Sequence, residues 1–205
     1  MSRELLAGPA GARALAERGF GFPLLLRSPG YHTGRNFVLV ESRADLAAAT
    51  QSLPGDELLA IEYLDARGPD GRARKFRVMM IGGQLYPLHL AISRDWKVHY
   101  FTSDMANEPG HRAEEAKFLA DMSATLGAEA MRALESIQAA LGLDYAGIDF
   151  GLSRDGELLL FEANATMVIA KPGNDAHWAY RHGAIDRVLE AATAMLTDKA
   201  APNCR

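Results

Sequence analysis

The stretch that decides the fold lies at residues 145–167, which read YAGIDFGLSRDGELLLFEANATM. Two runs rich in β-forming and apolar residues flank Arg154-Asp155-Gly156. An Asp-Gly pair between apolar runs is a strong short-range signal for a tight turn, because glycine adopts the backbone angles that the turn requires. The stretch therefore predicts a β-hairpin.

Three polar side chains fall inside the apolar runs of this hairpin. Residues two apart share one face of a strand, so Glu162 and Asn164 point the same way, and Asp149 lies roughly opposite them if the strands pair across the turn. Carboxylate and carboxamide oxygens are the hard ligands that Mg²⁺ prefers, and Mg²⁺ shares such ligands with nucleotide phosphates. The alternative is a hairpin whose acidic residues are solvated, although buried carboxylates are costly unless they are paired or metal-bound.

The strand Gly147-Ile148-Asp149-Phe150, followed by Phe161-Glu162-Ala163-Asn164, resembles the C-terminal signature of the ATP-grasp superfamily. That superfamily includes D-alanine–D-alanine ligase, glutathione synthetase and the ribosomal-protein glutamate ligases. The resemblance implies that Asp149, Glu162 and Asn164 hold Mg²⁺, with Mn²⁺ as a substitute, against the phosphates of ATP. It also assigns Phe161 to the nucleotide site.

Composition sets broad limits on the class of protein. The chain has 205 residues, 48% of them hydrophobic, and a net charge of −4, which suits a globular protein of one domain or two small lobes and argues against a general nucleic-acid or anionic-membrane binder. The single Cys204 excludes an intrachain disulfide. The sequence carries no membrane-length apolar run and no signal-peptide pattern at its start, so we expect a cytoplasmic protein.

A predicted strand over Phe22–Arg27 ends in a cation and leads into a loop that contains Gly30, His32 and Gly34. Glycines let backbone N–H groups approach phosphates closely, and a cation offsets phosphate charge. The resemblance implies that Arg27 and this loop contact ATP phosphates, with His32 as a further candidate. Loops with two glycines that bind nothing are the common alternative.

The strand Leu58–Asp65 carries an acidic residue at its end. By resemblance, Glu62, Tyr63 and Leu64 match the segment that links two lobes and presents backbone groups to adenine. The alternative is a core strand with a solvated end.

Lys75 and Arg77 share one face of the next predicted strand, which forms a hairpin around Gly82-Gly83. Two adjacent cations need anions, and the resemblance makes Arg77 the leading catalytic candidate, with Lys75 beside it, at ATP and acyl phosphates. Surface charges on an edge strand are the alternative.

The sequence of residues 93–100 predicts a loop and a short strand. His89, Trp96 and His99 are candidates for lining the substrate side of the site. Packing between the lobes explains these three residues nearly as well. This stretch resembles a bacterial ATP-grasp subgroup often found behind tetratricopeptide repeats. Lys171 is a further candidate phosphate contact, or simply a solvated lysine. The remaining pattern predicts helices over Ala10–Glu17, from Ser42 onward, over Arg112–Leu126 and Glu129–Leu141, and from Asp175 to about Thr197.

Together these features predict an α+β ATP-grasp fold with mostly antiparallel sheets. We expect a small lobe with an N-terminal helix over residues 1–59, a larger lobe carrying the metal site over 60–205, and nucleotide in the cleft between them. The resemblance implies an ATP-dependent ligase that activates a carboxylate as an acyl phosphate for attack by an amine, with no nucleic-acid or membrane partner.

The resemblance also implies a shortened N-terminus, because complete ATP-grasp ligases carry a substrate domain before the first strand. A partner domain on the N-terminal side, or a homodimer, would supply what is missing. The alternative function is a non-catalytic nucleotide-binding module of a larger protein or assembly.

Overall fold

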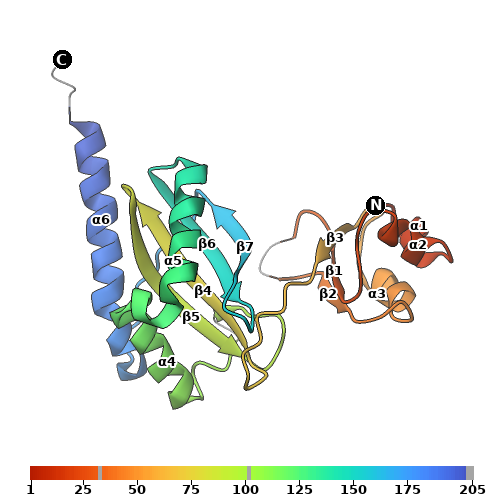
Figure 1. The fold of residues 1–205 in the computed structure, drawn as a ribbon, viewed down its shortest axis with the longest axis horizontal. Helices are drawn as coiled ribbons and strands as arrows, with labels where there is room; N and C mark the ends of the chain where they lie inside the picture. The colour runs from red at the N-terminus through yellow and green to blue at the C-terminus, as the bar shows by residue number, and fades with distance from the viewer. Residues whose placement is uncertain (32–33, 101–102, 202–205) are drawn as a thin grey trace. The chain divides into compact units, whose positions relative to one another are not determined.

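The computed structural model describes residues 1–31, 34–100 and 103–201 (Figure 1). The chain forms two compact units, Met1–Leu64 (unit 1) and Asp65–Arg205 (unit 2). This division falls later than the predicted boundary after residue 59, because the strand that contains that boundary pairs within the sheet of unit 1.

Unit 1 is a three-stranded antiparallel sheet, ordered β2-β1-β3, covered by three short helices. Its apolar core draws on Leu6, Leu15, Leu24 and Val40, which are almost fully buried. The elements in chain order are α1 (Arg3–Ala7), α2 (Gly11–Ala16), β1 (Leu24–Arg27), β2 (Phe37–Val40), α3 (Leu46–Ser52) and β3 (Leu59–Glu62).

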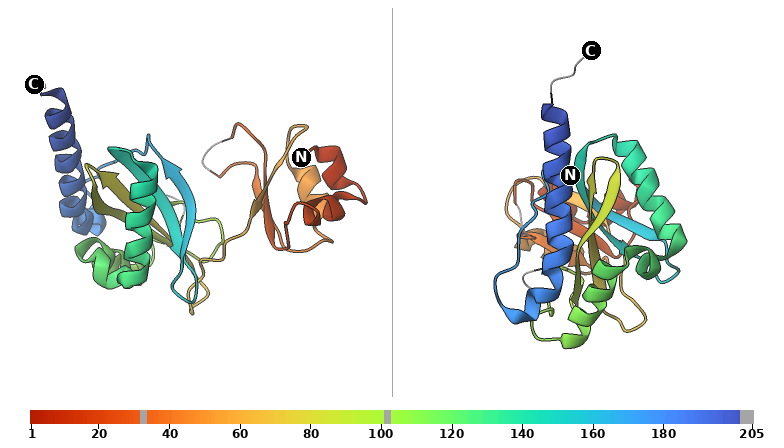
Figure 2. Two further views of the ribbon diagram at one scale, coloured as in Figure 1. Left: turned by 45° about the horizontal axis from the view of Figure 1, so that its top comes forward. Right: turned by 90° about the vertical axis from the view of Figure 1, so that its left-hand side faces the viewer.

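Unit 2 is built on a four-stranded antiparallel sheet with the order β5-β4-β6-β7 (Figures 1 and 2). The predicted hairpin is its β6–β7 pair, and the predicted Gly82-Gly83 hairpin is its β4–β5 pair. The elements are β4 (Ala73–Ile81), β5 (Gln84–Ser93), α4 (Pro109–Ala120), α5 (Met122–Leu141), β6 (Tyr145–Leu152), β7 (Leu158–Asn164), the 3₁₀ helix η2 (Ala176–Arg181) and α6 (His182–Ala200). The expected α+β class with antiparallel sheets is thereby confirmed.

Successive side chains of β4 lie on opposite faces of the sheet and pack into two different cores. Phe76, Val78 and Met80 pack with Phe118 of α4 and Leu134 of α5 on one face. Met79 and Ile81 point to the other face and pack with Ile185 and Val188 of α6. Because Lys75 and Arg77 are in phase with Met79, they belong to the α6 face of the sheet.

Several predicted helix boundaries are wrong, each for a local reason. A helix α1 forms before the predicted one, since Ser2 caps it by accepting a hydrogen bond from the N–H of Leu5. Helix α3 begins at Leu46, because the N–H and hydroxyl of Ser42 both donate to the Asp45 carboxylate and do not cap a helix there.

The predicted break between the two long helices is confirmed at Gly127, whose φ and ψ of 79° and 167° kink α5 there. A second break, which was not predicted, falls at Asp121, whose carboxylate accepts a hydrogen bond from the N–H of Ala124 (2.9 Å) and caps α5. Asp175 is a cap as predicted, although it caps η2, and α6 follows from His182. Residues 94–100 form no strand, because β5 ends at Ser93.

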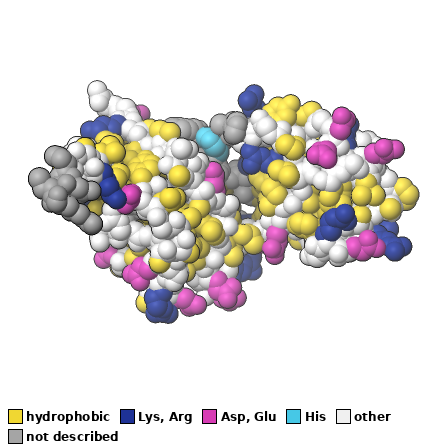
Figure 3. Space-filling model, turned by 90° about the horizontal axis from the view of Figure 1, so that it is seen from above, with side chains coloured by type: hydrophobic (Ala, Val, Ile, Leu, Met, Phe, Trp, Pro, Cys, Tyr) yellow, Lys and Arg dark blue, Asp and Glu magenta, His cyan; other side chains and the backbone are white. Residues whose placement is uncertain are grey.

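In the view of Figure 3, basic and acidic side chains are scattered among hydrophobic and other side chains. Within the described ranges, no helix combines the length and the apolar content that crossing a lipid bilayer requires.

Candidate functional site

Four polar side chains form a row across the four strands of unit 2. His89 of β5 is paired in register with Arg77 of β4, Arg77 with Asp149 of β6, and Asp149 with Glu162 of β7. Directly paired residues of antiparallel strands carry their side chains on the same face. The row therefore lies on the α6 face, and we call it the polar row.

Asp149 is the centre of this row and is almost completely buried, at 3% exposure. Both of its oxygens accept hydrogen bonds from Arg77, with Nε on Oδ1 at 2.5 Å and Nη2 on Oδ2 at 2.8 Å. The ammonium of Lys75 adds a third bond to Oδ2 at 2.9 Å. Such charge-assisted, bidentate contacts are the strong hydrogen bonds of proteins. The predicted pair of cations thus shares one carboxylate, which leaves one positive charge in excess.

These contacts set the ionisation of Asp149. Burial acts to raise the pKa of its carboxyl, but the hydrogen bonds from Arg77 and the charge of Lys75 outweigh burial and hold the pKa at about 2. Asp149 is therefore an anion at neutral pH and a permanent partner for both cations.

A β-bulge shapes the neighbouring strand. Asp149 pairs with Glu162 and Phe150 with Leu160, so Phe161 is an extra residue in β7. A Cβ atom placed on Gly151 would lie 2.9 Å from Cζ of Phe161, which places the Phe161 ring over Gly151, a residue in phase with Asp149. The bulge therefore places Phe161 and Glu162 on the same face of the sheet, whereas in a regular strand two consecutive residues face opposite sides.

The three predicted metal ligands come together as expected from the hairpin. Asn164 pairs with Gly147, two residues from the Asp149–Glu162 pair, and its Nδ2 donates to Oε1 of Glu162 at 3.3 Å. Oδ1 of Asn164 accepts from the N–H of Thr166 (2.7 Å) and from its hydroxyl (2.8 Å). Among the described residues, no cluster of three His, Cys, Asp or Glu side chains could hold a metal ion, so a metal here would depend on the amide of Asn164.

The chemistry of this donor set fits Mg²⁺. Glu162 is exposed and offers carboxylate oxygens to a hard cation. A carboxylate has about four lone-pair positions, and the three bonds from Arg77 and Lys75 leave one of those of Asp149 open.

The residues predicted to contact nucleotide from the first part of the chain lie in unit 1. Gly30 and Gly34 both adopt positive φ angles, 78° and 71°, which suits the loop predicted for them, and Arg27 donates to the carbonyl of Tyr31 within that loop. Glu62 lies on β3, with Tyr63 and Leu64 after it at the end of unit 1. His32 lies outside the described residues. The nucleotide roles of these residues stay predictions.

A second polar cluster in unit 2 was not predicted. Glu115 of α4 is fully buried and accepts hydrogen bonds from the N–H of Leu90 (3.2 Å), the hydroxyl of Tyr100 (3.2 Å) and the hydroxyl of Tyr180. Nε of Arg181 lies 3.3 Å from its Oε1. Burial raises the pKa of Glu115, against the lowering effects of Arg181 and the hydrogen bonds.

The sequence did hold one signal for this cluster. Glu115 precedes Phe118 and Leu119 by three and four residues, so it occupies the apolar face of its helix. Its partners Tyr100 and Arg181 stand in unrelated segments, and nothing local connects them to it.

Three solved structures similar to this one come from different enzymes. They are carboxyaminoimidazole ribonucleotide synthase from Aspergillus clavatus complexed with ATP (16% identity, TM-score 0.47), a biotin carboxylase–β,γ-ATP complex from Campylobacter jejuni (16%, 0.46) and L-amino acid ligase from Bacillus licheniformis (13%, 0.46).

The matches cover 92%, 91% and 95% of this chain but 45%, 40% and 48% of the respective enzymes. The chain thus spans less than half the length of the proteins it is similar to. No protein-family model matches the sequence, and neither does the sequence of any curated protein.

Proposed function

We propose that the chain is an ATP-grasp domain that binds ATP with Mg²⁺ and activates a carboxylate as an acyl phosphate for attack by an amine. The observation that carries this proposal is the polar row, in which one buried carboxylate, Asp149, is placed between two cations and the exposed carboxylate of Glu162. Transfer of a phosphoryl group requires metal-binding oxygens and cations side by side, because negative charge must be offset on several oxygens at once.

Lys75 and Arg77 would stabilise the transferring phosphoryl group and the acyl-phosphate oxygens. Their side chains are 17% and 22% exposed, so they are partly shielded from water, where such interactions are stronger. Asp149 holds both cations in place, and the single excess positive charge is available to an anion. This arrangement favours a phosphorylated ligand over a structural role for the pair.

Asp149, Glu162 and Asn164 would hold Mg²⁺, with Mn²⁺ as a substitute. The bound metal would offset charge on the phosphate oxygens of ATP. Asn164 restrains Glu162 through its Nδ2 donor, and Thr166 in turn fixes Asn164. The exposed ring of Phe161, on the same face as Glu162, is the apolar surface we assign to the nucleotide.

Calorimetric titration of ATP into the full chain, with Mg²⁺ and with EDTA, tests the proposal, together with phosphate release in the presence of candidate acids and amines. We expect Mg²⁺-dependent binding, weakened at least about tenfold by Glu162→Gln because a charged metal ligand is lost. The matched control is Glu157→Gln, an exposed residue at the turn of the same hairpin, which should bind ATP as the unmodified chain does.

Equal ATP affinity in Mg²⁺ and EDTA would show that the metal assignment is wrong. A folded chain with no measurable ATP affinity would overturn the proposal itself. Tight binding with no acid-stimulated phosphate release would favour the non-catalytic nucleotide-binding module.

A further inference from the structure

A cavity of about 200 Å³ opens beside the polar row, and unit 2 supplies its whole lining. Four cationic side chains line it: Lys75, Arg77, Lys171 and Arg181. The carboxylates that pair with these cations lie outside the lining: Asp149 with Lys75 and Arg77, Asp186 with Lys171, and Glu115 with Arg181. Four cations against three carboxylates leave one positive charge in excess, which favours a singly charged anion.

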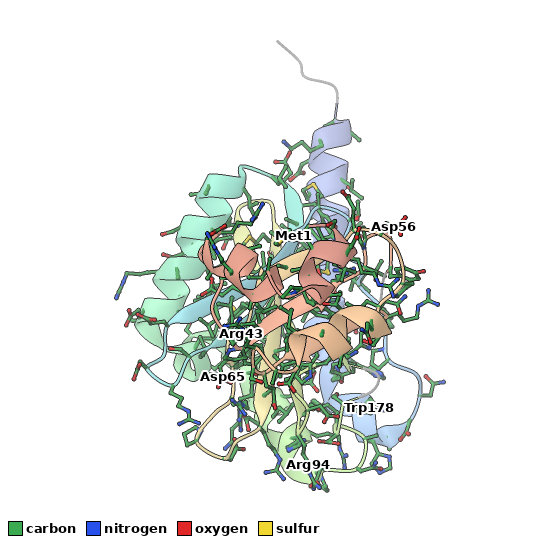
Figure 4. All side chains as sticks on the ribbon, turned by 90° about the vertical axis from the view of Figure 1, so that its right-hand side faces the viewer. Met1, Arg43, Asp56, Asp65, Arg94 and Trp178 are labelled. Carbon is green, nitrogen blue, oxygen red and sulfur yellow. The ribbon has the colours of Figure 1, made fainter. Side chains whose placement is uncertain are left out.

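Arg181 is the most buried of these cations. It is 7% exposed, its guanidinium carbon lies 4.4 Å from the centre of the Tyr100 ring, and its Nε faces Glu115 at 3.3 Å. Trp178, labelled in Figure 4, stands one 3₁₀ turn earlier on η2 and packs on the same Tyr100 ring at 6.1 Å. Because Nε faces Glu115 while Arg181 lines the cavity, the other N–H donors of the guanidinium are those that a ligand can reach.

Glu115 determines this orientation. It is fully buried and fixed by donors from Leu90, Tyr100 and Tyr180, which belong to three different segments. Nε of Arg181 makes no hydrogen bond among the described residues, so the ion pair with Glu115 and the contact with the Tyr100 ring are what restrain the guanidinium. Its planar fork of donors matches a carboxylate.

His89 provides an independent sign of a ligand. It is 6% exposed, it lines the cavity, and its Nδ1 has no hydrogen-bond partner among the described residues. A buried polar atom left unpaired is costly and unusual in a folded protein. Burial, and then the charge of Arg77, lower the pKa of His89 well below its ordinary value, so the neutral ring offers one donor and one acceptor.

The size and the remaining lining of the cavity restrict the ligand further. At about 200 Å³ the cavity is smaller than the roughly 300–1,000 Å³ of pockets for drug-sized ligands, which suits a small organic acid better than a nucleotide. Leu88, Val168 and Pro172 give part of the lining an apolar character, which inorganic phosphate would not use.

We propose that this cavity binds a small carboxylic acid, whose carboxylate is held by Arg181 and the Lys75–Arg77 pair while its body lies against the apolar lining, and that Glu115 is a positioning residue that fixes Arg181. The inference rests on the proposed function in one respect, because it identifies this acid as the one that is activated. Binding of the acid itself requires neither ATP nor Mg²⁺.

Saturation-transfer NMR on the full chain, free of nucleotide and metal, tests the proposal with butyrate, alanine and succinate as probes. Butyramide serves as the neutral match of butyrate, and inorganic phosphate as the competing anion. We expect at least one of the acids to bind more tightly than about 10 mM and butyramide not to bind. Absence of binding by all three acids, or binding of phosphate alone, would overturn the proposal.

Two single variants, their double variant and a control variant assign the residues. Arg181→Gln and Glu115→Gln are each expected to weaken acid binding at least about tenfold, because a charge-assisted contact is lost or misplaced. If Glu115 acts through Arg181, the double variant is no weaker than Arg181→Gln alone, a result that a merely structural role would not give. Arg132→Gln removes an exposed cation of α5 and should leave acid affinity unchanged.

The double variant also covers the case in which Arg181→Gln fails to fold. It removes both buried charges and so leaves neither unpaired, and its fold can be checked by thermal unfolding. Acid affinity that persists in the folded double variant would refute the site. Titration of the same samples with Mg·ATP separates the two proposals. Acid binding without ATP binding would support the cavity assignment and refute the proposed function. ATP binding without acid binding would support the proposed nucleotide site and refute the cavity assignment.

Discussion

At the scale of single residues, Asp149 shows why a pair of cations is stable in a sheet interior. Its carboxylate has a side-chain exposure of 4% and offsets Lys75 and Arg77 together. Removing the Asp149 carboxylate alone costs more stability than replacing all three charged side chains together, because Lys75 and Arg77 then stay partly buried without an anion. The same three residues are those that we assign to phosphoryl chemistry, so stability and function depend on one contact set.

Asp149→Asn is expected to lower the free energy of unfolding of unit 2 at pH 7 by about 2–4 kcal/mol, because both cations lose a charged acceptor. The pKa of Asp149 is lowered from 3.8 to about 2 in the folded protein. Its contribution to stability is therefore complete above pH 4 and is lost as the pH falls towards 2. At pH 3 the difference between the two proteins should be about 1 kcal/mol smaller than at pH 7.

Urea unfolding followed by tryptophan fluorescence measures this difference. Both tryptophans of the chain, Trp96 and Trp178, belong to unit 2. Asp155→Asn, an exposed residue at the turn of the same hairpin, is the control and should leave the unfolding midpoint nearly unchanged at both pH values. A stability difference for Asp149→Asn that does not vary with pH would contradict the account of its ionisation.

At the scale of elements, Gly151 of β6 allows neighbouring segments to pack closely against the strand. A Cβ atom on Gly151 would lie 2.3 Å from Cβ of Ala66 and 3.2 Å from the carbonyl oxygen of Arg74, as well as close to the Phe161 ring. Neither the Ala66 Cβ nor the backbone can swing aside as the end of a flexible side chain can. The absence of a side chain at Gly151 is thus what allows Phe161 and the segment at Ala66 to pack on this strand.

Gly151→Ala is expected to destabilise unit 2 by about 1–3 kcal/mol, through overpacking against backbone and Cβ atoms. Gly110→Ala is the matched comparison, since a Cβ there meets no atom within 4 Å and the residue lies in helix α4. That variant should be more stable than the unmodified chain by roughly 0.5–1 kcal/mol, because alanine has the higher helix propensity. Thermal unfolding of both variants measures the contrast, and equal effects would show that the packing at Gly151 can relax.

The hairpin and its three candidate ligands could be predicted from sequence because their signals are local. The Asp155-Gly156 turn predicts the hairpin and brings Asp149 close to Glu162 and Asn164. Unbroken register from the turn would pair Asp149 with Phe161, and the bulge shifts that pairing to Glu162. The bulge at Phe161 has no comparable signal, since one extra residue in a strand leaves the composition of the strand unchanged. Helix α1 was missed because Gly8 and Pro9 weaken its pattern, whereas the Ser2 cap suffices to start it.

The anion cavity could not be predicted for a different reason. Its cations come from β4, from the segment after β7 and from η2, and its buried carboxylate comes from α4. Only packing brings these segments together, and single-sequence periodicity carries no information about which helices meet. Several lining residues were nonetheless candidates from sequence: His89 and His99 for the substrate side, and Lys75, Arg77 and Lys171 for phosphate. Arg181 and Glu115 were not.

At the scale of the whole molecule, each unit has a hydrophobic core of its own. The core of unit 1 includes Leu6, Leu24 and Leu26, and the two cores of unit 2 lie on opposite faces of its sheet. A compact unit with its own core behaves as a cooperative unit in unfolding. The two units are therefore expected to respond separately to substitutions in their cores.

Leu24→Ala tests this expectation. Leu24 is fully buried in β1, in register with Val40 of β2 and Glu62 of β3, so its truncation leaves a cavity inside the sheet of unit 1. Loss of a buried leucine side chain costs about 2–5 kcal/mol. We expect the variant to lower the unfolding midpoint of unit 1, measured by hydrogen exchange at the amides of β1, while the tryptophan-detected transition of unit 2 stays at its original midpoint.

Leu134→Ala, in the core of unit 2, should instead lower the midpoint of unit 2 and leave that of unit 1 unchanged. A shift of both transitions by either substitution would mean that the chain unfolds as a single cooperative unit.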